Sequence, residues 1–121
     1  MIREIDRGEG GRTWYETVHG TSVRVTDSGS SLILTLQQLR ILKLVLSHLK
    51  IREIARSLGI KPRSVQTSLY LAIEGNKELL GDIGEQRAFY LAVQAQIRGW
   101  LEDEFIYLME EHLRAAKGKS N

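Results

Sequence analysis

The fold that we expect is decided by one stretch of the chain, IREIARSLGIKPRSVQT, which spans residues 51–67. Apolar residues recur at helical spacing as far as Leu58, and Gly59 supplies the positive φ with which many helices end. Pro62 suits the first turn of a further helix, because the N–H that it lacks would have no partner there. The stretch therefore predicts a short helix, a tight turn and a second helix over residues 62–74.

A longer helix is predicted immediately before this stretch. Thr35 and Gln38 have the spacing of a capping box, in which each side chain accepts from the backbone N–H of the other residue. The apolar residues that follow recur three or four positions apart and form one stripe: Leu39, Leu42, Val45, Leu46 and Leu49. Residues 32–80 are therefore expected to form a domain of three helices.

The helix over residues 62–74 presents a polar face opposite its apolar stripe. The residues on this face are Arg63, Ser64, Gln66, Thr67, Tyr70 and Glu74. Arg, Gln, Thr and Ser are side chains that hold phosphates or read base edges in the major groove. Two helices joined by a glycine turn, the second with such a face, are typical of a helix-turn-helix. We therefore expect double-stranded DNA as the partner.

The distribution of charge agrees with this expectation. The chain has a formal net charge of only +2, but residues 32–80 carry eight Lys or Arg against three Glu, which is +5. Residues 1–31 carry four basic against five acidic residues, and residues 81–121 carry five against seven. A basic segment between two slightly acidic ones is the electrostatic pattern of a nucleic-acid surface.

Two segments of the chain carry a resemblance to a known family: LTLQQLRILKL at residues 34–44 and the stretch at residues 51–67. Together they resemble the LuxR/GerE-type DNA-binding domain, in which a helix of the form L-T-x-x-E-x-x-V-L precedes a helix-turn-helix. They are also similar to region four of bacterial sigma factors. The resemblance covers about residues 34–73, a third of the chain.

The resemblance implies that Lys50 and Arg52 contact phosphates and that Ser64 contacts the DNA backbone. It implies that the side chains of Gln66, Thr67 and Tyr70 enter the major groove. The chain departs from the family where a Ser or Thr usually caps the recognition helix, since it has a lysine there, which can hold a phosphate instead. The residues expected at the DNA interface are Lys50, Arg52, Lys61, Arg63, Ser64, Gln66, Thr67 and Tyr70.

The first 31 residues differ in pattern from the helical part. Residues 7–12 are rich in glycine and read as a flexible lead-in. Residues 14–18 and 22–26 are rich in β-branched and aromatic residues, and the second run alternates with strand period. We expect a β-hairpin that forms part of an N-terminal arm over residues 1–31.

The last part of the chain, residues 81–121, predicts a long helix over about residues 85–117 with apolar residues on two sides. One small domain can bury one such side, so the second predicts a two-fold homodimer. The residues expected at the dimer interface are Leu71, Phe105, Ile106, Met109 and Leu113. The alternative is a break near Gly99, after which the chain folds back on its own domain.

Catalytic and metal chemistry finds little support in the sequence. The chain has no cysteine, and its three histidines, His19, His48 and His112, form no spaced pair. We expect no catalytic residue, no metal and no cofactor. The chain has no run of 18 apolar residues and a charged start, so we expect no membrane segment and a cytoplasmic, nucleoid-associated protein.

These observations predict a mainly α fold: a helix-turn-helix domain of three to four helices, with an N-terminal β-hairpin and a long C-terminal helix. The function expected first is that of a small transcriptional regulator that binds a specific DNA sequence as a dimer. The alternative is a non-catalytic protein of one of two kinds. It is either an assembly protein similar to a terminase small subunit, or an adaptor that contacts RNA polymerase as a sigma factor does.

Overall fold

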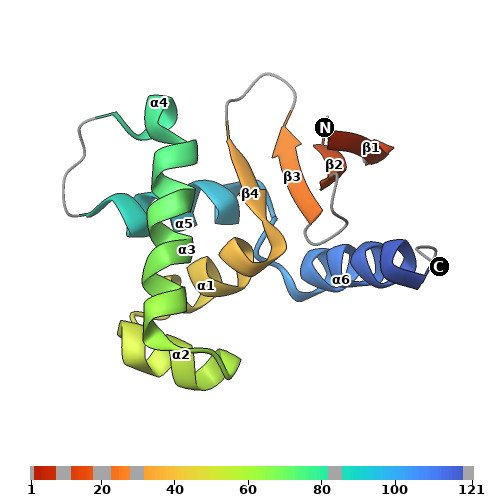
Figure 1. The fold of residues 1–121 in the computed structure, drawn as a ribbon. Coiled ribbons are helices and arrows are strands. Elements are labelled where there is room, and N and C mark those ends of the chain that lie inside the picture. Colours follow the sequence, from red (N-terminus) through yellow and green to blue (C-terminus); the bar gives the residue numbers. More distant parts are fainter. Residues whose placement is uncertain (1, 8–11, 18–22, 28–31, 82–85, 119–121) are drawn as a thin grey trace.

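The computed structural model describes residues 2–7, 12–17, 23–27, 32–81 and 86–118 (Figure 1). The chain is mainly helical, as predicted. Within the described residues, four strands precede six helices. The strands are β1 (Ile2–Arg7), β2 (Arg12–Thr17), β3 (Val23–Asp27) and β4 (Ile33–Thr35). The helices are α1 (Leu36–Leu46), α2 (Ile51–Leu58), α3 (Pro62–Gly75), α4 (Lys77–Leu80), α5 (Arg87–Ile97) and α6 (Asp103–Gly118).

The four strands form one antiparallel sheet in the order β1-β2-β3-β4. Strands β2 and β3 lie where the sequence predicts strands, although Val18 and Ser22 fall outside the described residues. Strands β1 and β4 were not predicted. Because Val25 of β3 pairs with Leu34 of β4, the sheet joins the predicted N-terminal arm to the predicted helical domain.

Helix α1 begins where β4 ends. Thr35 has extended backbone geometry, and its hydroxyl accepts from the backbone N–H of Gln38 at 3.2 Å. The Gln38 side chain accepts in turn from the backbone N–H of Thr35 at 2.9 Å. The predicted capping box is therefore confirmed, and it fixes the point at which the strand becomes a helix.

Three helices end with the same backbone motif, in which one residue at positive φ lets the next N–H reach a carbonyl five positions back. The residues at positive φ are His48 after α1, Gly59 after α2 and Gly99 after α5. The hydrogen bonds are Leu49 to Leu44 at 3.3 Å, Ile60 to Ala55 at 3.0 Å and Trp100 to Ala95 at 3.0 Å. The role predicted for Gly59 is confirmed, and that of His48 was not foreseen.

The expected long C-terminal helix is wrong, because α5 and α6 are separate helices divided at residues 98–102. Gly99, at φ +76°, ends α5. Trp100 and Leu101 then turn into the core, where the Trp100 ring stacks on Phe105 with centroids 6.3 Å apart. The break directs apolar side chains of both helices into one core, whereas a continuous helix would leave one set in water.

The core has two connected parts. The larger one lies among the sheet, α1, α3, α5 and α6, and its fully buried residues include Leu39, Leu91 and Trp100. The smaller one holds α1, α2 and α3 together through Ile41, Ile54, Ala55 and Val65. Figure 1 shows α2 and α3 on one side of the domain and α6 on the other, next to β3 and α1. In the part of the chain that the structure describes, no helix is both long and apolar enough to cross a bilayer.

A buried asparagine connects the sheet to the end of α3. Asn76 as a whole residue is 1% exposed. Its Oδ1 accepts from the backbone N–H of Ile33 at 2.7 Å, and its Nδ2 donates to the carbonyls of Ile33 at 3.0 Å and Ala72 at 2.7 Å. The amide thus satisfies both backbone groups of Ile33, as a neighbouring strand would.

Replacement of Asn76 by aspartate tests this connection. A carboxylate oxygen in the place of Nδ2 would face the carbonyl oxygens of Ile33 and Ala72, which would lose their donor. We expect Asn76→Asp to lower the free energy of unfolding by about 3 kcal/mol in urea titrations. The control is Glu78→Gln on α4, an exposed position where we expect a change below about 0.5 kcal/mol. Equal stability of the two variants would show that the amide contributes nothing.

The break at Gly99 predicts that Gly99→Ala lowers the stability of the fold, whereas a continuous helix predicts that the same substitution raises it. Gly99 is at φ +76°, so Gly99→Ala should destabilise the fold by about 1 kcal/mol even though a methyl group there meets no atom closer than 3.8 Å. Gly75→Ala is the matched control, because Gly75 lies in α3 with open space around it and should gain stability from alanine. Thermal melts followed by circular dichroism compare the two. Stabilisation by Gly99→Ala would contradict the break.

Candidate nucleic-acid interface

Helices α2 and α3 form a unit held by small and β-branched residues. Ile54 and Ala55 of α2 are 1% and 2% exposed, and Val65 of α3 is fully buried against them. The small side chain of Ala55 lets the two helices approach closely. Gly59 closes α2 in the left-handed conformation, and Pro62 opens α3 two residues after Ile60, as predicted. The outer side of α3 is thereby directed away from the core.

The start of α3 lacks a side-chain cap, as its sequence predicts. Lys61 precedes the helix and makes no side-chain capping hydrogen bond, and the first turn contains no acidic residue. The exposed Arg63 side chain follows within that turn. The positive end of the helix dipole is therefore accompanied by two cationic side chains and by no carboxylate of its own turn.

All eight residues predicted at the DNA interface are exposed, and they lie on α2, on α3 or immediately before one of these helices. They are Lys50, Arg52, Lys61, Arg63, Ser64, Gln66, Thr67 and Tyr70. Exposure alone is common for polar residues, so the arrangement matters more. Residues from the N-terminal ends of α2 and α3 line one open groove of about 960 Å³. It is lined by Lys50, Ile51, Arg52, Glu53, Pro62 and Gln66.

Charge is concentrated on this side of the domain. Residues 50–63 hold five basic residues against one acidic residue, Glu53, and all five basic side chains are exposed. The basic residues are Lys50, Arg52, Arg56, Lys61 and Arg63. Among the residues that the structure describes, none of the five takes part in an ion pair. Their charge is therefore available to an anionic partner.

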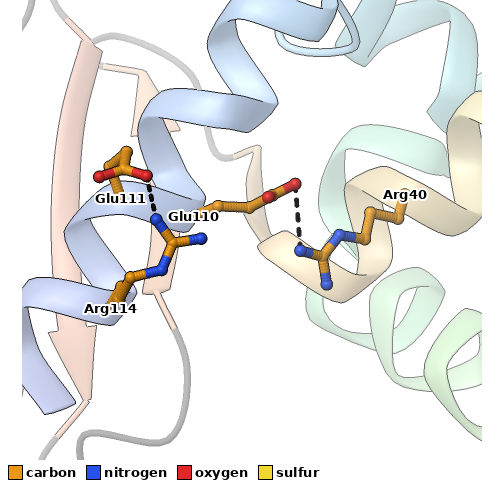
Figure 2. Close-up of polar contacts among 4 residues, drawn as sticks. All are labelled: Arg40, Glu110, Glu111 and Arg114. Atoms are coloured by element: carbon orange, nitrogen blue, oxygen red, sulfur yellow. Dashed lines mark hydrogen bonds and ion pairs between the residues drawn. The ribbon is translucent and has the colours of Figure 1, made fainter.

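The basic residues of α1 are used differently. Arg40 forms an ion pair with Glu110 of α6 at 3.1 Å (Figure 2). Lys43 pairs with Asp103 at the start of α6. The acidic cluster at residues 102–104 thus contributes one carboxylate to an ion pair with α1. The +5 charge of residues 32–80 is consequently partly neutralised on α1 and left unpaired on α2 and α3.

Glu53 is a residue whose structural role the sequence reasoning missed. Its Oε1 accepts from the backbone N–H of Lys50 at 2.9 Å, across the first turn of α2. The spacing of three residues between Lys50 and a glutamate before an apolar run was the signal that could have revealed this bond. The carboxylate stabilises the start of α2 and also lowers the positive potential of the groove.

The predicted dimer interface is wrong for three of its residues. Phe105, Ile106 and Met109 are 5%, 8% and 0% exposed, because the break at Gly99 turns them into the core of their own domain. Leu71 is 55% exposed, and the side chain of Leu113 lies outside the described residues. Among the described side chains of α6, the large apolar ones that are exposed are Tyr107 and Leu108.

The described histidine and the carboxylates are dispersed. His48 is exposed and stacks on Phe89 with ring centroids 5.5 Å apart, whereas His19 and the side chain of His112 lie outside the description. Within the described residues, no three His, Cys, Asp or Glu side chains lie close enough to hold a metal ion.

Comparison with known proteins adds no relative. No model of a protein family matches the chain, and neither does any curated protein or solved structure. The chain's own geometry and charge therefore carry the argument about its function.

Proposed function

We propose that the chain is a double-stranded DNA-binding protein in which α2, the turn at residues 59–61 and α3 act as a helix-turn-helix. In this proposal, the exposed side of α3 enters the major groove. The observation that carries it is the run of five exposed basic residues over residues 50–63, none of which forms an ion pair among the described residues. Two of them, Lys50 and Arg52, line one open groove together with Gln66 of the polar face of α3. Like charges held close together repel one another, and a polyanionic partner removes that repulsion.

The side chains divide into two groups by their chemistry. Lys50, Arg52 and Lys61 are cations beside helix N-termini, where phosphates are favoured by charge and by the helix dipole. Gln66 and Thr67 lie further along the exposed side of α3, where their donors and acceptors suit base edges. The proposed interface thus has positioning contacts at its rim and base contacts along the helix.

The resemblance to LuxR/GerE-type domains supports the DNA-binding part of the proposal, and a small transcriptional regulator is the role that we propose for it. The order of a capped helix, a short helix and a third helix after a glycine turn is the order that the resemblance implies. A two-fold dimer is also proposed, but through surfaces other than Phe105, Ile106 and Met109. Binding as a ring of many copies would instead favour the assembly function.

Selection of bound duplexes from a random pool tests the proposed function. A DNA-binding regulator should enrich one preferred sequence, and its affinity should fall steeply with salt as counterions are released. Sedimentation of the same sample reports whether one, two or many copies bind. Failure to retain any duplex at about 50 mM salt, where phosphate contacts are strong, would refute DNA binding by this chain.

The charge of Glu53 provides a prediction in which affinity increases. Glu53→Gln keeps a side-chain acceptor for the N–H of Lys50 but removes the only negative charge from residues 50–63. We expect affinity for duplex DNA to rise about twofold at low salt, from the Coulomb energy of one charge about 8 Å away in water. Glu104→Gln on α6 makes the same charge change away from this side and should leave affinity unchanged. A fall in affinity with Glu53→Gln and an unchanged melting temperature would contradict the proposed face.

The phosphate contacts predict a change in salt dependence. Lys61→Ala should weaken binding to all duplexes alike and reduce the slope of log K against log salt by about 0.9. Lys77→Ala removes the same charge from α4, at an exposed position away from the groove, and should leave the slope unchanged. Fluorescence anisotropy titrations between about 50 and 200 mM salt, the range in which such slopes are resolved, measure both variants. Equal slopes for the two variants would contradict the role of Lys61.

A further inference from the structure

Two Tyr-Leu pairs on the surface are nearly identical in exposure. Tyr70 and Leu71 of α3 are 62% and 55% exposed, and Tyr107 and Leu108 of α6 are 59% and 51% exposed. Large apolar side chains that remain this open to water mark candidate contact surfaces. The two pairs share composition and helical setting, so their different surroundings decide what each can contact.

The pair on α6 lies among carboxylates. Glu104 precedes Tyr107 and Leu108 by one helical turn and Glu111 follows them by one turn, so both acids share their side of the helix. Glu111 forms an ion pair with Arg114, one turn further on, so among the described residues this surface carries one net negative charge and no unpaired cation that would attract a DNA duplex. The α6 pair is therefore a control for any role proposed for the other pair.

The pair on α3 continues the proposed DNA-reading side. Tyr70 lies four residues after Gln66, and Leu71 lies four residues after Thr67, so each shares a side of the helix with a residue suited to base edges. Leu71 also lines an open groove of about 320 Å³ together with Ile33 and Gln38. Glu74, one turn further on, marks the point at which the helix becomes unfavourable for phosphates.

An apolar pair on such a face has one apolar partner in the major groove, the C5-methyl group of thymine. The other groups that base edges present there are hydrogen-bond donors and acceptors. We propose, on the basis of the proposed DNA-binding function, that Tyr70 and Leu71 contact thymine methyl groups. The preferred site then contains thymine about one helical turn along α3 from the bases that Gln66 and Thr67 read.

Uracil provides a direct test, because it pairs with adenine as thymine does and lacks only the methyl group. The probe is the duplex that the wild-type chain selects from a random pool, synthesised with thymine and then with uracil at each thymine in turn. We expect uracil at one or two positions to weaken binding about fourfold each, as the burial of one methyl group implies. Substitutions at the remaining thymines should have no effect.

The paired variants assign the effect to the side chains. Tyr70→Ala with Leu71→Ala should lower affinity for the thymine duplex and bring the thymine-to-uracil ratio to one. Tyr107→Ala with Leu108→Ala, the matched control on α6, should keep the wild-type ratio. All four side chains are exposed, so both double variants should melt within a few degrees of the wild type.

The possible failures are distinguishable. If the wild-type chain binds no duplex, the proposed function itself fails. If it binds but uracil has no effect at any position, or if the Tyr70 and Leu71 variant keeps the wild-type ratio, methyl recognition is overturned. Leu71 is also a residue predicted at a dimer interface, but loss of a dimer would weaken thymine and uracil duplexes alike and leave the ratio unchanged.

Discussion

The arrangement of the helices depends on how the outer edge of strand β4 is satisfied. An edge strand presents backbone N–H and C=O groups that need partners. The Asn76 amide satisfies both groups of Ile33, and the Gln38 side chain accepts from the N–H of Thr35. Because β4 runs directly into α1 and Asn76 immediately follows α3, these bonds hold both helices against the sheet. The direction in which α3 presents its outer side follows from this connection.

The distribution of unpaired charge follows from the same packing. Helix α6 lies against α1, and its carboxylates pair with Arg40 and Lys43. These side chains are between one third and nine tenths exposed, so the pairs add little to stability. Their effect is on the electrostatic field, because they neutralise Arg40 and Lys43 of α1, whereas the five basic residues at positions 50–63 are opposed within that segment by Glu53 alone. A chain with a net charge of +2 thus acquires one strongly basic side.

The backbone conformation of Gly99 decides whether the apolar residues of the C-terminal part are buried within one chain or need a partner chain. As a continuous helix, residues 85–117 would have two apolar sides, and the second would need a partner chain. With Gly99 at positive φ, the chain turns, and Phe105, Ile106 and Met109 complete the core of their own domain. The same rotation exposes Tyr107 and Leu108. Burial that the pattern assigns to a dimer is achieved within one chain, so the periodicity by itself did not require a dimer.

The features that the sequence alone determined are local ones. The Thr35 capping box, the turn at Gly59, the start of α3 at Pro62 and the exposed side of α3 all rest on backbone preferences or on residues three or four positions apart. Within the described residues, the tertiary structure decided the pairing of β4, the positive φ of His48, the direction of α6 and the partners of the α1 cations. The Asn76 amide and Ile33 are 43 residues apart, and Lys43 and Asp103 are 60 apart. Contacts at such separations depend on how the whole chain packs, and no periodicity in the sequence specifies them.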